Sequence, residues 1–545
     1  MGCCKCKEHE WSDPQPVVYT DPEYGKGYCL FHAPAEHKGV SVDAFNEQVS
    51  ERIQATIDLE NDGSPCCFDG TIFPGEICFY PDCAFPKISF RKVQFKGDAL
   101  FRRSTFGSGT TFGASVFEGF ANFSDVIFGD GADFFHAIFK RDTSFLRAIF
   151  EEGVSFYHVE FKGSAYFDLA KFKGHSFPQR IVSFFLYGAN FCKVVFGDGV
   201  GFSEATFECR AVFSESVFRG KAKFYHTSFK EDAIFGNVSF EDHSSFVSAC
   251  FVKMADFSGA SFRSSISFGY ANFESVAFFS SANFVESAYF NATFRGKVGF
   301  DSVKFSERAF FSSAVFNGSV TFDAMTTTES SLLEFDNCTI STSAIIFQCC
   351  DPTCLDLTQQ YDLANIHFIN SPWEKNGRIK ACTEDQEDKL QFTRDLYQRM
   401  KAKYKAENNE YEASKWHVAE KEAQLKLLEQ NGESWFLQKA LWTYKKVSGF
   451  GENPVCAAWW LLFLLLTPLF VLSMGEVSQH FVLWNIDSTK VHAVIKDWLK
   501  FIPLTKASTL KDELGGWHLL AVGWQLLVTV QAALFGFALR NKFRR

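Results

Sequence analysis

Phenylalanine recurs through the middle of this chain at a spacing that alternates between five and six residues. The run starts at Phe90 and reaches Phe172 without a slip, and it resumes from Phe185 to Phe322. Phe makes up 67 of the 545 residues, far more than an ordinary globular domain contains. The repeating unit is therefore eleven residues long and consists of two similar, shorter segments.

A second column of small or β-branched residues lies two positions before the Phe residues, as at Ala121, Ala132 and Val154. Residues two apart point to the same side of an extended backbone, so each short segment turns one small side chain and one Phe inward. Gly often follows Phe, as at Gly107 and Gly129. Because glycine suits corners with unusual backbone angles, we expect these glycines to supply them.

An α-helix does not fit this period. At 3.6 residues per turn, a five-residue step turns the next Phe roughly 140° away from the previous one, and abundant Gly, Ser, Thr and Val disfavour a helix. A β-solenoid fits, because each coil packs its Phe residues against the coils above and below. The sequence therefore predicts a mainly β protein with a solenoid at residues 61–357.

Tandem units such as Ala121-Asn122-Phe123, Ala255-Asp256-Phe257 and Ala282-Asn283-Phe284 resemble the pentapeptide-repeat family. The resemblance covers residues 66–347. It implies a right-handed quadrilateral β-helix with four faces, about 22 residues per coil and about 13 coils. The repeated Phe residues are then core residues, and none of them is expected to have a chemical role.

Three segments break the period. Residues Gly174–Arg180 include Pro178 and are expected to protrude, either as an ordinary bulge or as a recognition loop. One residue is deleted between Phe290 and Phe294, and Met325–Leu332 is an insertion.

The first 60 residues are expected to form an N-terminal cap with a metal site. Its candidate ligands are Cys3, Cys6, Cys29 and His32, in two closely spaced pairs that are typical of a four-ligand zinc site. Thiolates and a neutral imidazole suit tetrahedral Zn²⁺, so a structural Zn²⁺ is the predicted cofactor. Two alternatives stay open: free cysteines in a small cap, or an acylated start at Met1–Cys4.

Other features of the cap follow from the same segment. Cys4 and His9 are alternative candidates for one of the four ligand positions. Residues Val42–Leu59 have the apolar period of an amphipathic helix, which could shield the first coil, since solenoids need capped ends. The 17 cysteines and the absence of a secretory signal indicate a reducing compartment.

The composition changes after Leu357, and helical patterns replace the Phe repeat. Residues 358–383 are expected to be a linker, and residues 384–450 a hairpin with helices at Glu384–Asn408 and Glu410–Gln430. The hairpin is similar to a single tetratricopeptide-like unit, through Tyr411-Glu412-Ala413. Its buried faces are expected to carry Phe392, Leu396, Tyr397, Met400 and Tyr404 on the first helix, and Ala413, Trp416, Ala423 and Leu427 on the second.

Two apolar stretches, Val455–Met474 and Trp517–Leu539, are long enough to span a bilayer. They make residues 451–545 a two-span transmembrane region with the lipid bilayer as its partner. Gln525 and Gln531 lie roughly 120° apart around the second helix, so one narrow stripe of it cannot hold both, and each is expected to face a partner helix or water. The segment Tyr444–Pro454 is similar to the junction of membrane-attached pentapeptide-repeat proteins, with Phe450 in place of Tyr.

Basic residues favour cytoplasmic N- and C-termini. Seven Lys and Arg residues flank the outer ends of the two spans, against five Lys residues in the loop Gly475–Gly516. Positive residues remain on the cytoplasmic side. The chain is thus expected to be an integral membrane protein whose solenoid faces the cytoplasm.

The leading functional interpretation is a membrane-anchored scaffold that binds an unidentified protein partner. The alternative is a subunit of a homo-oligomeric ion channel or membrane effector, although the loop lacks a Thr-Val-Gly-Tyr-Gly filter. DNA mimicry requires a strongly acidic face. The solenoid, residues 66–350, has 30 acidic and 25 basic residues, a net of −5, so no nucleic acid partner is expected.

Nothing in the sequence favours an enzyme. No Gly-rich phosphate loop, Gly-x-Ser-x-Gly elbow or His-Glu-x-x-His motif occurs. The histidines His158, His175, His226 and His243 are scattered over solenoid positions. We therefore expect no catalytic residues, and no cofactor besides the structural zinc.

Overall fold

The computed structural model divides the chain into two compact units, Met1–Pro372 and Trp373–Arg545. It describes residues 2–11, 15–58, 66–79, 84–85, 87–174, 188–341, 344–360, 363–371, 387–432, 434–477, 488–503 and 518–543.

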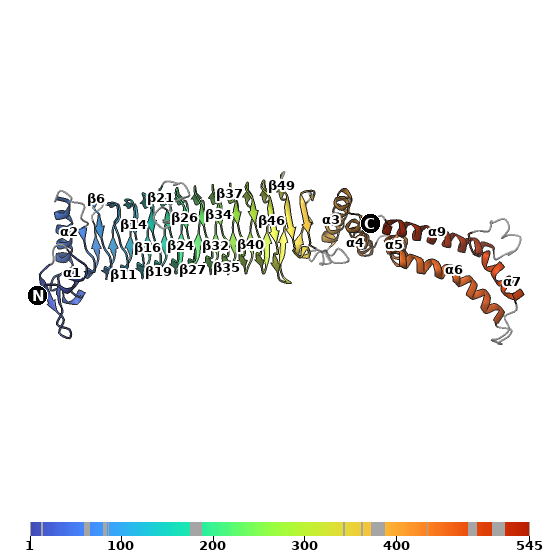
Figure 1. Ribbon diagram of the computed structural model, residues 1–545, viewed down its shortest axis with the longest axis horizontal. Helices are drawn as coiled ribbons and strands as arrows, with labels where there is room; N and C mark the ends of the chain where they lie inside the picture. Colours follow the sequence, from blue (N-terminus) through green and yellow to red (C-terminus); the bar gives the residue numbers. More distant parts are fainter. Residues whose placement is uncertain are drawn as a thin grey trace. The chain divides into compact units, whose positions relative to one another are not determined.

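The first unit is a β-solenoid, as predicted. One coil comprises four two-residue strands: β13 (Ile127–Phe128), β14 (Ala132–Asp133), β15 (Ile138–Phe139) and β16 (Thr143–Ser144). Each strand pairs in parallel with the strand 22 residues further on, so that Ile127 lies opposite Ile149. Figure 1 shows these coils stacked from blue to yellow along the unit.

The strands lie on four faces of the solenoid. Face 1 begins with the pair β3 (Cys66–Cys67) and β7 (Ile88–Ser89), continues through the isolated bridges of Thr111, and runs on as an 11-stranded sheet from β14 to β52 (Ile366–Ile369). Face 2 runs from β4 (Ile72–Phe73) to β47 (Thr326–Thr327). Face 3 runs from β5 (Ile77–Cys78) to β51 (Leu355–Asp356) and contains 13 strands. Face 4 runs from β6 (Ala84–Phe85) to β49 (Thr339–Ile340). The four faces and about 13 coils match the expected architecture.

Phe rings fill the interior of the solenoid in continuous stacks. The Phe145 ring lies 4.9 Å from the Phe123 ring and 4.8 Å from the Phe167 ring, nearly parallel to both. It meets the rings of Phe134 and Phe156 edge to face. Small residues occupy the remaining inward positions, because four large rings leave no room for more volume in one coil.

Left-handed backbone recurs every eleven residues, at alternate corners of the coil. It falls two residues after Phe, mostly on residues other than Gly, as at Asp125 (φ 58°) and Arg147 (φ 55°). The expectation that Gly107 and Gly129 supply the unusual angles is therefore wrong. Gly129 is needed for close approach, since a Cβ there would lie 2.7 Å from the backbone nitrogen of Ser108.

The solenoid continues into the segment expected as a linker. The last strand of face 1, β52, pairs with β50 (Ile345–Gln348), and the Phe368 ring stacks 5.5 Å from Phe347. Leu355, Leu357 and Ile366 fill inward positions here. The Phe period fades in these coils while the packing persists, so the Phe spacing alone predicts an end at residue 357 that is too early.

Some predicted features lie outside the described residues. They include nearly all of the loop Gly174–Arg180. Cys66, in the first strand of face 1, is buried. No disulfide joins the cysteines within the described ranges.

One corner near the end of the solenoid carries a carboxyl group in an unfavourable position. Burial, together with repulsion from Asp356 and Glu334, raises the pKa of Asp336 to about 6. Because this pKa exceeds the usual unfolded value of about 3.9, the carboxyl costs no stability below about pH 4 and destabilises the fold as pH rises through 6.

We therefore expect Asp336→Asn to stabilise the solenoid by about 1 kcal/mol at pH 7.5, after allowance for solvent screening, and not at pH 4. Urea denaturation at both pH values measures this. Asp125→Asn is the matched control, because Arg147 holds the pKa of the Asp125 carboxyl below its ordinary value. An equal gain from Asp125→Asn would contradict the electrostatic cause.

The N-terminal cap covers the first coil. It contains α1 (Cys4–Glu8), β1 (Val17–Thr20), β2 (Gly27–Cys29), a 3-10 turn, η1 (Ala35–His37), and α2 (Val42–Asp58). The helix expected at Val42–Leu59 is thus present as α2, and its Phe45 ring lies 5.6 Å from the ring of Phe73 in the first coil. The Asn46 side chain donates a hydrogen bond to the Glu76 carbonyl at 2.9 Å.

The second unit begins with the predicted hairpin, α3 (Glu387–Ala406) and α4 (Glu410–Gln430). The Tyr397 and Trp416 rings pack 5.4 Å apart between the two helices. Phe392, expected on the buried face, is 41 % exposed, whereas Leu390 is buried. The contact face of α3 is therefore rotated from the predicted one toward Leu390.

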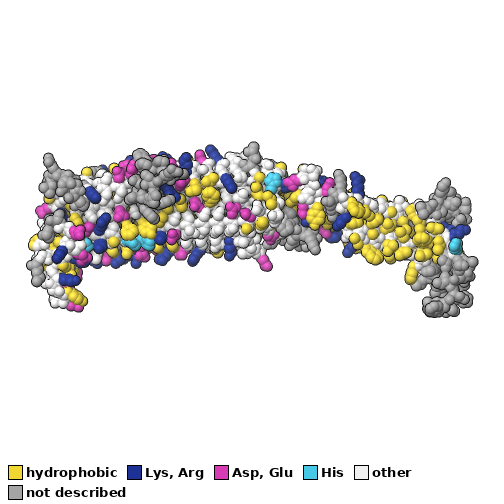
Figure 2. Space-filling view, in the orientation of Figure 1, with side chains coloured by type: hydrophobic (Ala, Val, Ile, Leu, Met, Phe, Trp, Pro, Cys, Tyr) yellow, Lys and Arg dark blue, Asp and Glu magenta, His cyan; other side chains and the backbone are white. Residues whose placement is uncertain are grey.

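The remaining helices are α5 (Trp435–Ser448), α6 (Pro454–Val477), α7 (Ser488–Leu499) and α9 (His518–Phe543). Within them, Pro454–Leu472 and His518–Phe543 are long and apolar enough to cross a membrane. Both carry large apolar side chains on the surface, which Figure 2 shows as continuous yellow on α6 and α9.

Candidate metal centre

The first two candidate ligands lie on one side of α1. The carbonyl of Cys3 accepts a hydrogen bond from the Lys7 backbone N–H at 3.3 Å, so Cys3 caps the helix. Residues three apart share a helix face, which brings the sulfur of Cys6 beside that of Cys3. Both cysteines are buried.

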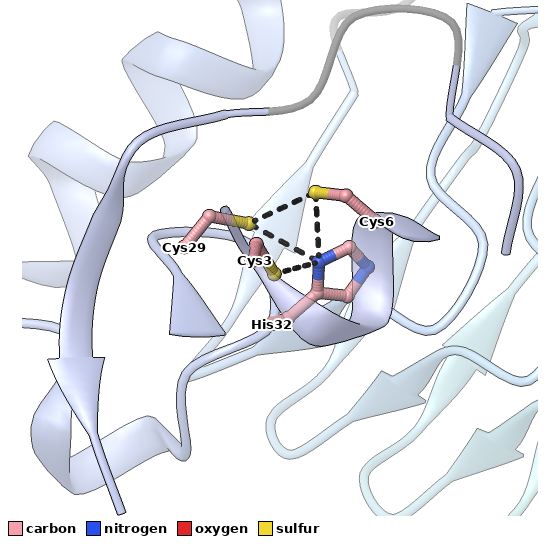
Figure 3. Close-up of side chains that lie close together, drawn as sticks. All are labelled: Cys3, Cys6, Cys29 and His32. Atoms are coloured by element: carbon pink, nitrogen blue, oxygen red, sulfur yellow. Dashed lines mark hydrogen bonds between the residues drawn. The ribbon is translucent and has the colours of Figure 1, made fainter. Parts of the chain in front are cut away.

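The other two ligands lie at the end of β2. Cys29 closes the strand, and its carbonyl accepts hydrogen bonds from the backbone N–H groups of His32 and Ala33, at 3.1 and 2.8 Å. This tight turn folds His32 back over Cys29, and both are buried. The x2 spacing in the sequence thus places both side chains on the side of the turn that faces α1 (Figure 3).

The four ligand atoms lie within 4.8 Å of one another. His32 Nδ1 is 3.4 Å from Cys3 Sγ, 3.5 Å from Cys6 Sγ and 3.1 Å from Cys29 Sγ, and the sulfurs of Cys6 and Cys29 are 3.6 Å apart. Tetrahedral Zn²⁺, with Zn–S about 2.3 Å and Zn–N about 2.0 Å, requires edges of about 3.8 Å between sulfurs and about 3.5 Å from sulfur to nitrogen. The cluster could therefore hold a metal ion with little rearrangement.

A hydrogen bond fixes which nitrogen of His32 faces the sulfurs. His32 Nε2 lies 2.9 Å from the Asp69 carbonyl oxygen and donates to it. The lone pair of Nδ1 then points toward the cysteines, as a metal ligand requires. Trp11 Nε1 donates to the same carbonyl at 3.2 Å, and the Trp11 ring packs 4.7 Å from that of His32.

Burial sets the protonation of the cluster. It lowers the pKa of His32 to about 4, so the imidazole is neutral at physiological pH. Burial also raises the pKa of the Cys6 and Cys29 thiols. A metal ion binds the deprotonated thiolates, so metal binding by these thiols is coupled to proton release.

Lys38 places a buried amino group beside the cluster. Its Nζ donates hydrogen bonds to the carbonyls of Leu30 and Phe31, at 2.5 and 3.1 Å, between the ligands Cys29 and His32. Burial lowers the pKa of Lys38 to about 7. Three thiolates around a divalent cation carry a net charge of −1, which a charged Lys38 would offset.

The structure brings together all four predicted ligands and leaves the substitutes out. Cys4 and His9 do not belong to the cluster. Cys3, a candidate for acylation, is only 3 % exposed. Cys350 and Cys354, at the other end of the solenoid, are buried and form no metal-binding group within the described part of the chain. Sequence reasoning missed Lys38 and the Asp69 carbonyl, and nothing in the spacing of these residues marks them.

The fold and this cluster define the chain as a β-solenoid protein with a Cys- and His-bearing cap. Two segments of the solenoid, residues 90–138 and 213–261, match the family model described as pentapeptide repeats (9 copies). The solenoid is therefore made of pentapeptide repeats, as the sequence indicated. Neither a curated protein nor a solved structure matches the chain.

Proposed function

We propose that the protein is a membrane-anchored scaffold: α6 and α9 cross the bilayer, the solenoid presents binding surfaces in the cytoplasm, and Zn²⁺ closes the cap. The observation that carries the anchor is the exposed apolar surface of the two helices. Leu466 of α6 and Val530 of α9 are 46 % and 51 % exposed near the helix centres. Apolar surface of this extent is unusual in water and ordinary in lipid.

Polar contacts between the two helices support the same proposal. Gln531 is buried, and its Nε2 donates to the Ala457 carbonyl at 2.8 Å. Gln525 Nε2 instead donates to the carbonyls of Lys500 and Ile502 beyond α7, at 2.8 and 3.1 Å. Each amide thus has a protein partner, as polar groups at membrane depth require.

A charge placed on the apolar surfaces tests the anchor. We expect the full chain to remain in the membrane pellet after alkaline carbonate washing, and the double variant Leu466→Arg/Val530→Arg to be largely lost from it. Each Arg costs about 2.5–3.5 kcal/mol at a helix centre. Tyr225→Arg, on an exposed site of the solenoid, is the control and should change nothing. Wild-type protein in the soluble fraction would refute the anchor.

Protease treatment of intact cells tests the orientation. An impermeant protease is expected to leave residues 66–369 uncut until the membrane is permeabilised, because Lys and Arg residues flank the outer ends of both spans. Cleavage before permeabilisation would reverse the proposed topology without affecting the anchor.

The proposed Zn²⁺ has a structural role. Three thiolates and one imidazole occupy all four positions of a tetrahedron, and structural zinc sites are closed in this way, whereas catalytic sites keep one position for water or substrate. The ion would tie α1 to β2 and both, through the Asp69 carbonyl, to the first coil. A solenoid needs such a closed end to remain soluble.

A further inference from the structure

The corner between faces 3 and 4 carries a continuous backbone ladder along the solenoid. In the coils before the deletion, the corner residue with left-handed backbone donates its N–H to a carbonyl in the next coil. The acceptor is the carbonyl of the residue that directly follows the inward Phe. Examples are Ser248 to Gly269 at 2.8 Å and Tyr270 to Asn291 at 2.9 Å. Each of these corners has three residues between the inward Phe and the first residue of the next strand. The second of the three has φ near 55°.

The one-residue deletion in the Phe period removes this left-handed residue from a single corner. Between Phe290 and Thr293 only Asn291 and Ala292 remain, and neither has positive φ. The ladder resumes one coil later, where Ser313 donates to the Asp336 carbonyl at 2.8 Å. The carbonyl of Ser312 therefore lacks the N–H donor that the equivalent carbonyls of other coils have. No other group among the described residues donates a hydrogen bond to it.

Two backbone N–H groups at the same place also lack an acceptor among the described residues, as does the equivalent N–H of Tyr225 in an intact coil. In the two preceding coils, the hydroxyls of Ser245 and Ser267 accept from the N–H groups that open the corner, at 3.4 and 3.2 Å. Tyr289 and Phe310 occupy the equivalent positions in the next two coils. Neither side chain accepts a hydrogen bond here, and the N–H groups of Asn291 and Ser312 have no partner in the described part of the structure.

Aromatic side chains form the wall of this defect. The rings of Tyr289 and Phe310 stack 4.8 Å apart. Tyr270, in the coil above, is 79 % exposed although its φ of 56° is unfavourable for a bulky residue. The corner is hollowed by a cavity of about 580 Å³, and no charged side chain lines it. Strain and exposed aromatic area together are typical of binding sites.

We propose that this hollow is a docking site for an uncharged, extended peptide segment of a partner protein. The deleted residue would have donated its backbone N–H to the Ser312 carbonyl, and Asn291 and Ser312, whose own N–H groups have no acceptor among the described residues, line the same hollow. One peptide unit supplies both a donor and an acceptor, as in β-strand addition. An aromatic or proline ring on the peptide would pack against Tyr270, Tyr289 and Phe310. The proposal rests on the scaffold function above and names the chemistry of its partner.

Repair of the deletion is the decisive test. Displayed seven-residue peptides are selected on the detergent-solubilised full chain. We expect enrichment of uncharged sequences with an aromatic or proline residue. Insertion of one serine between Asn291 and Ala292 restores the period and supplies the missing ladder donor to the Ser312 carbonyl. It should lower affinity for the selected peptides at least tenfold while the solenoid's denaturation midpoint stays the same or rises.

Two further variants control for general effects. Tyr270→Ser removes an exposed ring and should lower affinity several-fold without loss of fold. Tyr225→Ser, at the same corner of an intact coil, should leave affinity unchanged. No enrichment of any sequence, or equal affinity after the insertion, overturns the proposal. Because binding is measured in detergent, neither result bears on membrane anchoring, which the carbonate experiment tests separately.

Discussion

Replacement of Cys29 by serine is expected to reduce bound zinc from one ion per chain to a small fraction and to unfold the cap. The sulfur of Cys29 lies 3.1 Å from His32 Nδ1 and 3.6 Å from Cys6 Sγ, so its loss opens one corner of the tetrahedron. Outer partners of a metal typically contribute 10–100-fold to affinity. Loss of a direct ligand should exceed that, and we expect at least a 100-fold decrease.

The cap should respond because metal binding and folding are linked. Structural zinc contributes roughly 10 kcal/mol or more to folding in small domains, and residues 2–58 bury few large side chains besides those of α2. Elemental analysis gives the metal content, and hydrogen exchange shows which residues lose protection. We expect faster exchange in residues 2–58 and in the first coil, with the central coils unchanged.

Cys4→Ser provides the matched control. Cys4 is adjacent to Cys3 in the sequence and does not belong to the cluster, so this variant should keep both zinc and cap. A zinc-free wild type with an intact cap would favour the alternative of free cysteines. Loss of zinc from Cys4→Ser as well would mean that the ligand set differs from the one proposed.

The sequence was sufficient to predict the solenoid because the Phe spacing is repeated many times. A single Phe-x-x-x-x-Phe spacing means little, but an eleven-residue period that continues from Phe90 to Phe172 leaves one fold that buries every ring. The clustering of the four candidate ligands in the cap was also predictable. Each pair has a local x2 spacing, and two such pairs supply the four ligands of a tetrahedral site.

Features that depend on contacts between coils were not predictable. Left-handed backbone falls on residues such as Asp125 and Arg147, because inter-coil hydrogen bonds impose the angle whatever the side chain. Lys38 lies beside the Cys and His cluster only because the η1 turn folds the chain back onto residues 30 and 31. The end of the solenoid was placed too early, since Leu and Ile replace Phe in the last coils without any change in backbone pairing.

Truncation of one ring in the central stack should destabilise the solenoid strongly. Phe145 is fully buried and contacts the rings of Phe123, Phe134, Phe156 and Phe167. Phe145→Ala removes the ring and leaves a cavity that stacked neighbours cannot fill, which costs about 3–5 kcal/mol. Phe145→Leu keeps most of the volume and should cost less. The midpoint of urea denaturation of the full chain in detergent gives the comparison.

The effect should also be local, because each coil contacts only its neighbours. We expect hydrogen exchange in Phe145→Ala to accelerate in the coils from Ala121 to Phe172 and to remain slow beyond Phe213. Phe135→Ala is the control: this residue lies in the same coil but is 41 % exposed, and loss of its ring should cost well under 1 kcal/mol. Equal destabilisation by both variants would mean that the buried stacks do not hold the coils together. Uniform loss of protection along the whole solenoid would instead mean that the coils unfold as a single cooperative unit.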